Sequence, residues 1–176
     1  MTNKQSRTGD HPARFSNAIL VKIDERLQAR RVVLDPFAGT GRIHELGTSK
    51  RRTIGVEIEP ECAAKHPDTL LGNALNLPFA DESVDAIATS PTYRNRMADH
   101  HKATDDSTRY THTSGHALAA DNSGQLRWGD KYRAFHEAVW AEAVRVLSRA
   151  ASSCSTSRAT FAVAECNESP PGACPS

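Results

Sequence analysis

The stretch that decides the fold is Arg31-Val32-Val33-Leu34-Asp35-Pro36-Phe37-Ala38-Gly39-Thr40-Gly41. Its first five residues form a largely apolar run that ends at a proline and a glycine-rich turn, a pattern typical of a strand buried on both faces. Gly39 and Gly41 let the backbone turn tightly and approach a ligand, and a helix is predicted over about 41–47. The stretch therefore predicts a strand, a turn with open backbone N–H groups, and a helix.

The same alternation continues along the chain. Further strands are predicted in TIGVEI (53–58), HPDTLLG (66–72) and VDAIATS (84–90), and amphipathic helices over about 16–29 and 131–147. Strands that alternate with helices favour a parallel sheet with right-handed crossovers. The predicted fold class is α/β, a Rossmann-like doubly wound mostly parallel sheet that is incomplete at its C-terminal strands.

Length and charge restrict the organisation further. The 176 residues, of which 38% are hydrophobic, suit one core, and a net charge of +1 excludes a global field that attracts nucleic acid. With no apolar run near the ~20 residues that span a bilayer and no signal peptide, we expect a cytoplasmic protein. We expect a disordered N-terminus at 1–10, one domain over 11–148 with an irregular insert at 94–129, and an atypical, disordered tail at 149–176.

An acidic residue after the second strand makes the glycine turn more specific. Glu57 follows the first strand by about 20 residues, where nucleotide-binding doubly wound folds place a carboxylate on ribose hydroxyls. A dinucleotide fingerprint would have glycine where His44 stands, and here Asp35 precedes the turn. Because a carboxylate repels a pyrophosphate but attracts an amino group, these residues favour a nucleoside cofactor that carries a cationic amino acid.

This combination resembles the class I S-adenosylmethionine-dependent methyltransferases, whose D-x-F-x-G-x-G turn holds the methionine part of the cofactor. The resemblance covers about residues 11–147 and implies S-adenosylmethionine as cofactor. It implies that Glu57 binds the ribose and that Asn73 and Phe15 lie near the adenine. Asn73 equally fits a turn residue before a helix, and Phe15 equally fits a core position of the first helix. The cofactor residues implied for the turn are Asp35, Phe37, Gly39 and Gly41.

The second motif is Ser90-Pro91-Thr92-Tyr93, at the carboxyl end of the strand predicted over 84–90. It resembles the (D/N/S)-P-P-(Y/F/W) signature of methyltransferases that act on exocyclic amino groups of nucleic-acid bases, with Thr92 in place of the second proline. The resemblance implies three catalytic residues: Ser90 and the Pro91 carbonyl accept the amine's N–H bonds, and Tyr93 stacks on a base removed from a helix. A Ser-Pro turn that merely ends a strand is the structural alternative.

The resulting functional hypothesis is methyl transfer to a nucleic-acid base, with DNA preferred as the partner and DNA methylation as the process. An RNA base amino-methyltransferase and a non-catalytic remnant that only binds cofactor or nucleic acid are the alternatives. A small-molecule methyltransferase is less consistent with the second motif. We expect no metal site, because the histidines of the 94–129 insert have no cysteine partners and no helix that would hold them at a fixed spacing.

The last residues differ from the rest of the chain. Of the cysteines, Cys154, Cys166 and Cys174 follow Ser148, and only ATFAVAE (159–165) predicts a short strand there. Read one base out of register, the tail permits Pro-Gly after the 131–147 helix and then an apolar run, where the fold needs a fifth strand. We therefore hypothesise that the chain is truncated or frameshifted at its C-terminus, which would leave it weak or inactive.

Overall fold

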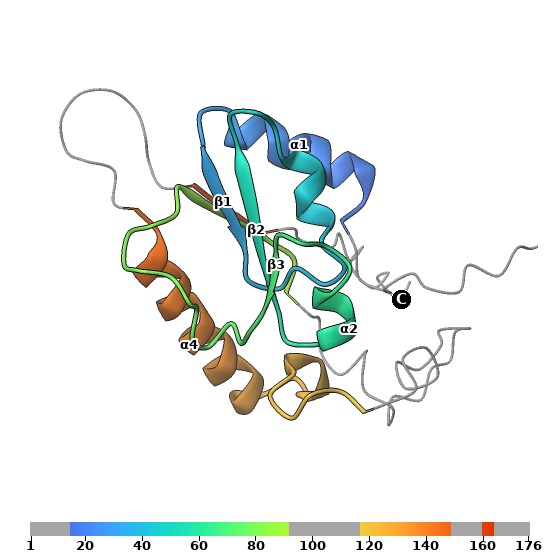
Figure 1. The fold of residues 1–176 in the computed structure, drawn as a ribbon. Helices are drawn as coiled ribbons and strands as arrows, with labels where there is room; N and C mark the ends of the chain where they lie inside the picture. Colours follow the sequence, from blue (N-terminus) through green and yellow to red (C-terminus); the bar gives the residue numbers. More distant parts are fainter. Residues whose placement is uncertain (1–14, 92–116, 149–159, 164–176) are drawn as a thin grey trace, which may run out of the picture.

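Parallel strands form the centre of the molecule (Figure 1). The computed structural model describes residues 15–91, 117–148 and 160–163. Within these ranges five strands form one sheet of order β3-β2-β1-β4-β5, and every neighbouring pair is parallel. The strands are β1 (Val32–Asp35), β2 (Arg52–Glu57), β3 (Thr69–Leu71), β4 (Ala86–Thr89) and β5 (Thr160–Val163).

Helices cover both faces of this sheet, as Figure 1 shows. On one face α1 (Asn17–Leu27) and the 3₁₀ helix η1 (Arg42–Leu46) pack in a core that includes Val33. On the other face α4 (Asp130–Val146) packs in a second core that includes Leu34. Successive strand residues point to opposite faces, so the apolar run of β1 supplies both cores. The sheet is therefore Rossmann-like and doubly wound, as the sequence predicted.

The predicted elements agree with the observed ones except in length and helix type. The predicted helix over 41–47 is a five-residue 3₁₀ helix, bounded by Gly41 and Gly47. The short α2 (Pro60–Ala63) and the 3₁₀ helix η3 (Ser123–Gln125) lie at the carboxyl edge of the sheet. The latter falls inside the stretch predicted as an irregular insert.

The tail contributes one observed element. The strand predicted in 159–165 is β5, which pairs with β4 in the register Ala86 to Thr160. Because the other tail residues lie outside the described ranges, the tail's disorder and the frameshift stay predictions. In the parts of the chain that the structure describes, no helix has the length and apolar character to cross a membrane.

Candidate functional site

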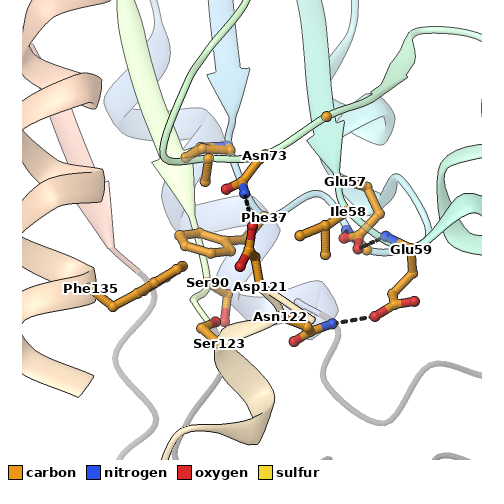
Figure 2. A pocket seen from close by; sticks show the side chains of 14 residues that line it. Phe37, Glu57, Ile58, Glu59, Asn73, Ser90, Asp121, Asn122, Ser123 and Phe135 are labelled. Atoms are coloured by element: carbon orange, nitrogen blue, oxygen red, sulfur yellow. Dashed lines mark hydrogen bonds between the residues drawn. The ribbon is translucent and has the colours of Figure 1, made fainter. Parts of the chain in front are cut away.

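A cavity lies at the carboxyl edge of the sheet, where doubly wound folds bind their ligands (Figure 2). About 570 Å³ between the lining residues is free of atoms, counting the part that is open to solvent. The residues that line it come from the ends of β1, β2, β3 and β4, from the η3 segment and from α4: Pro36, Phe37, Gly39, Glu57, Ile58, Glu59, Gly72, Asn73, Ala74, Ser90, Asp121, Asn122, Ser123 and Phe135.

Five of the site residues predicted from the sequence converge on this cavity. Phe37 and Gly39 come from the turn after β1, Glu57 from the end of β2, Asn73 from the loop after β3, and Ser90 from the residue after β4. Parallel strands in matched register end at the same edge, so motifs that are separate in the sequence become neighbours. The cavity therefore contains residues from both predicted motifs.

Glu57 holds the glycine turn in place. Its Oε2 accepts a hydrogen bond from the Gly39 N–H at 2.8 Å, and its Oε1 accepts one from the Glu59 N–H at 2.9 Å. Burial raises the pKa of the Glu57 carboxyl, and the two backbone hydrogen bonds oppose that shift. The carboxyl group is consequently fixed in one orientation at the cavity wall.

Asp35 lies beneath the cavity rather than at its surface. The side chain is 1% exposed, and its Oδ1 accepts hydrogen bonds from the Thr89 hydroxyl at 2.7 Å and the Phe37 N–H at 3.0 Å. Burial raises the pKa of this carboxyl from 3.8 to about 7. Asp35 thus ties the turn after β1 to the last residue of β4, directly before Ser90.

The remaining predicted residues lie elsewhere. Gly41 begins η1 with φ of 82°, and a Cβ there would come within 2.9 Å of the Cβ of His66, so glycine is required for packing. Phe15 is buried in the core beneath α1, the alternative that the sequence had offered. Pro91 is buried and is not among the cavity-lining residues, and Tyr93 lies outside the described residues, as does Thr92.

Sequence reasoning missed the second wall of the cavity. Glu59 is 2% exposed, and its Oε1 accepts hydrogen bonds from the Ala119 N–H at 2.9 Å and the Asn122 side-chain amide at 2.6 Å. Asp121 accepts a hydrogen bond from the Asn73 amide at 3.2 Å (Figure 2). Glu59 precedes a proline and so resembles an ordinary helix start, and nothing in its local sequence indicates partners sixty residues away.

One histidine cluster away from the cavity has the composition of a metal site. Among the described residues, His44, His66 and Asp68 bring potential ligand atoms within 4.8 Å of one another. Both ring nitrogens of His44 are already hydrogen-bonded, Nδ1 to the Thr53 hydroxyl at 3.0 Å and Nε2 to the Thr69 hydroxyl at 2.8 Å. Burial lowers the pKa of His44 to about 4, and the two hydrogen bonds of its ring connect η1 to β2 and β3. The histidines considered from the sequence lie outside the described residues.

Comparison with known proteins gives likenesses only among solved structures. No family model matches the sequence. No curated protein matches it. A protein from Anaeromyxobacter dehalogenans, assigned as a type II methyltransferase, is 17% identical over 79% of this chain and 46% of its own, with a TM-score of 0.44.

Two further structures have similar values. An S-adenosylmethionine-dependent methyltransferase from Thermotoga maritima is 21% identical over 74% of this chain and 45% of its own, with a TM-score of 0.40. A phosphoethanolamine N-methyltransferase from Haemonchus contortus, in complex with phosphoethanolamine and S-adenosylhomocysteine, is 21% identical over 43% and 19%, with a TM-score of 0.38. The chain spans less than half the length of each of the three proteins. The fold described above rests on this chain's own strand order and register.

Proposed function

We propose that this chain is an S-adenosylmethionine-dependent methyltransferase that acts on an exocyclic amino group of a nucleic-acid base, with DNA as the preferred substrate. One observation carries the proposal: a single cavity joins the Phe37-Gly39 turn and Glu57 to Ser90. The first group suits the cofactor and the last suits the amine. The activity, the cofactor and the substrate class are all parts of this proposal.

The lining residues fit the cofactor by their chemistry. Glu57 offers a fixed carboxyl group to ribose hydroxyls, and the Gly39 backbone leaves space beside it. Phe37 and Ile58 supply apolar surface for a purine, and the Asn73 amide supplies polar contacts at the same wall. When bound, S-adenosylmethionine supplies a methyl group activated by a sulfonium.

Ser90 is the residue that we assign to the substrate amine. The amine's lone pair is delocalised into the base ring, so a hydroxyl oxygen that accepts one N–H bond favours a tetrahedral, nucleophilic nitrogen. We propose that the carbonyl of the next residue, Pro91, accepts the second N–H bond, which requires the bound base to reach beyond the residues that line the cavity in this structure. The Asp35–Thr89 hydrogen bond supports this role, since it holds the Ser90 backbone against the turn that lines the cofactor side. Positioning of the two reactants then supplies most of the rate enhancement.

Calorimetry with S-adenosylmethionine tests the cofactor half of the proposal. We expect binding to the wild-type chain and a dissociation constant at least tenfold higher for Glu57→Ala, because charge-assisted hydrogen bonds contribute about 1.5–3 kcal/mol. Glu137→Ala, on the exposed side of α4, is the matched control and should bind like the wild type. Absence of binding heat for the wild type would refute the proposal.

Transfer of a labelled methyl group tests the catalytic half. We expect label in single-stranded or duplex DNA, a loss of turnover of at least tenfold in Ser90→Ala, and an unchanged cofactor dissociation constant. Ser90→Asn keeps a side-chain acceptor and should retain more activity than Ser90→Ala. Label in RNA alone would favour the RNA alternative, whereas cofactor binding without transfer to either would indicate a binding remnant.

A further inference from the structure

An exposed tryptophan, Trp128, lies in the segment between two elements that line the cavity. Trp128 is 64% exposed. It lies between η3, whose Ser123 lines the cavity, and α4, whose Phe135 also lines it. Residues 125–131 surround an open hollow at this position. The indole therefore presents an accessible ring surface close in sequence to two residues that line the cavity.

A row of rings connects this tryptophan to the cavity wall. The indole of Trp128 packs on Tyr132 with ring centroids 5.3 Å apart, Tyr132 packs on His136 at 4.1 Å, and His136 stacks on Phe37 at 6.2 Å. Phe37 lines the cavity, and Tyr132 and His136 are buried. The row therefore places the exposed indole a few ring widths from the cavity, with one side of the indole packed on Tyr132.

The charges beside the indole suit phosphate. Arg127 and Lys131 are both exposed, and neither has an ion-pair partner among the residues that the structure describes. The acid nearest to them in the sequence, Asp130, pairs with Arg133, so this pair adds no net charge. An aromatic face flanked by two exposed cations matches the alternating bases and phosphates of a single strand.

We propose that Trp128, Arg127 and Lys131 form a docking surface for a nucleic-acid strand, with a base stacked on the indole and phosphates against the two cations. The inference deepens the proposed function and rests on it for the choice of ligand. The base held here is a neighbour of the one in the cavity, because the row of rings separates the two positions. This surface would orient the strand without taking part in methyl transfer.

Fluorescence tests the stacking directly. The chain has two tryptophans, so Trp140→Phe leaves Trp128 as the only source of tryptophan emission. Titration with a single-stranded oligonucleotide of mixed sequence, in a DNA and an RNA version, should quench that emission. Bases and phosphates are common to both strands, so the two versions show which sugar is preferred. Binding without quenching would overturn the proposal, as would a failure of both strands to bind.

Affinity measurements separate the stacking from the charges. Trp128→Ala should weaken binding of the oligonucleotide about tenfold, and Trp128→Phe should retain most of the affinity because it keeps a ring. Arg127→Gln and Lys131→Gln should each reduce the slope of affinity against salt by about one. Lys22→Gln, on α1, is the matched control and should leave both quantities unchanged. Wild-type affinity in Trp128→Ala would refute the surface.

The outcome for the surface can be distinguished from the outcome for the function. Trp128→Ala should bind S-adenosylmethionine with wild-type heat, since the residue does not line the cavity. If the wild type transfers methyl groups and Trp128→Ala binds the strand normally, the surface is wrong and the function stands. If strand binding depends on Trp128 but no methyl transfer occurs, the function is wrong and the surface stands.

Discussion

Asp35 illustrates how a residue that belongs to a motif can act beneath the site. The resemblance had placed it against the cofactor, whereas the structure buries it between Thr89 and the Phe37 N–H. A buried carboxyl that accepts hydrogen bonds from two different segments is well suited to join the ends of two strands. Asp35 therefore contributes to the site by fixing the position of the glycine turn relative to Ser90.

Asp35→Asn should stabilise the chain at high pH. The pKa of the acid is about 7 when folded and near 3.8 when unfolded, so between these values the folded state holds a proton that the unfolded state has lost. Its contribution to stability therefore falls as pH rises from 4 to 7. Asparagine keeps the accepting oxygen and removes the charge, and we expect a gain on the order of 2–4 kcal/mol at pH 8 and little change near pH 4.

Urea unfolding at the two pH values measures this difference. Asp85→Asn is the control, because Asp85 also accepts two backbone N–H bonds, from Arg31 and Val32. The free energy of unfolding of Asp35→Asn should differ from that of the wild type more at pH 8 than at pH 4. If the difference were the same at both pH values, Asp35 would not be a buried acid that holds its proton.

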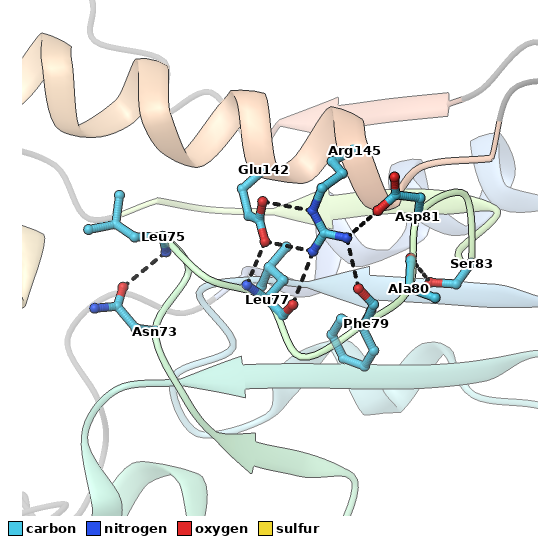
Figure 3. A network of polar contacts seen from close by, with 9 residues as sticks. All are labelled: Asn73, Leu75, Leu77, Phe79, Ala80, Asp81, Ser83, Glu142 and Arg145. Carbon is cyan, nitrogen blue, oxygen red and sulfur yellow. Dashed lines mark hydrogen bonds and ion pairs between the residues drawn. The ribbon is translucent and has the colours of Figure 1, made fainter.

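At the scale of elements, the guanidinium of Arg145 connects α4 to the loop before β4 through hydrogen bonds and ion pairs (Figure 3). Arg145 donates to the carbonyls of Leu77 and Phe79 and to the carboxylates of Asp81 and Glu142. Glu142 in turn accepts the Leu77 N–H at 2.9 Å. The neighbouring carboxylates raise the pKa of Arg145 further, and Arg145 lowers the pKa of Glu142. The network fixes the loop that connects the Asn73 wall to β4.

Arg145→Ala should loosen this loop more than it disturbs the helix. We expect faster amide hydrogen exchange at Leu77 and over 79–84 and a lower melting temperature. The carbonyls of Leu77 and Phe79 lose their donor, and Glu142, which accepts the Leu77 N–H, loses its ion-pair partner. Arg145→Lys, which cannot form the same planar fork, should give an intermediate result. Arg133→Ala removes one exposed ion pair from the same helix and should leave exchange in the loop unchanged. Unaltered exchange at Leu77 in Arg145→Ala would contradict the role of the network.

At the scale of the whole molecule, Glu59 connects the sheet edge to the η3 segment that closes one wall of the cavity. Its hydrogen bonds to Ala119 and Asn122 link parts of the chain that are sixty residues apart. Asn122 also orders η3, because its side-chain oxygen accepts the Gly124 N–H at 2.8 Å. One buried carboxylate therefore holds this wall at two points, in addition to the hydrogen bond between Asn73 and Asp121.

Glu59→Ala should release that wall. Hydrogen bonds to a carboxylate contribute about 1.5–3 kcal/mol, so we expect the Ala119 amide to exchange about tenfold faster or more. Glu59→Gln keeps one accepting oxygen and should show a smaller increase. Exchange in β1 and β2 should not change in either variant. An unchanged Ala119 amide would show that the segment is held by other contacts.

The sequence by itself determined the order and type of the main elements. The apolar run of 31–35, the glycine turn and the amphipathic 131–147 helix each carry a local signal, because burial on two faces and a 3.6-residue period are properties of short segments. Glu57 and Ser90 were also found locally, since each lies at the carboxyl end of a strand and therefore at the ligand-binding edge of the sheet.

Only the tertiary structure decided which of these residues share a cavity and what surrounds them. The burial of Asp35, the core position of Phe15 and the partners of Glu59 depend on segments that are far apart in the sequence. Local patterns report the conformation of a segment and the face that it buries, whereas hydrogen bonds between distant segments form only once the sheet has set its register. The motifs were therefore readable from the sequence, but the second wall of the cavity and the row of rings from Phe37 to Trp128 were not.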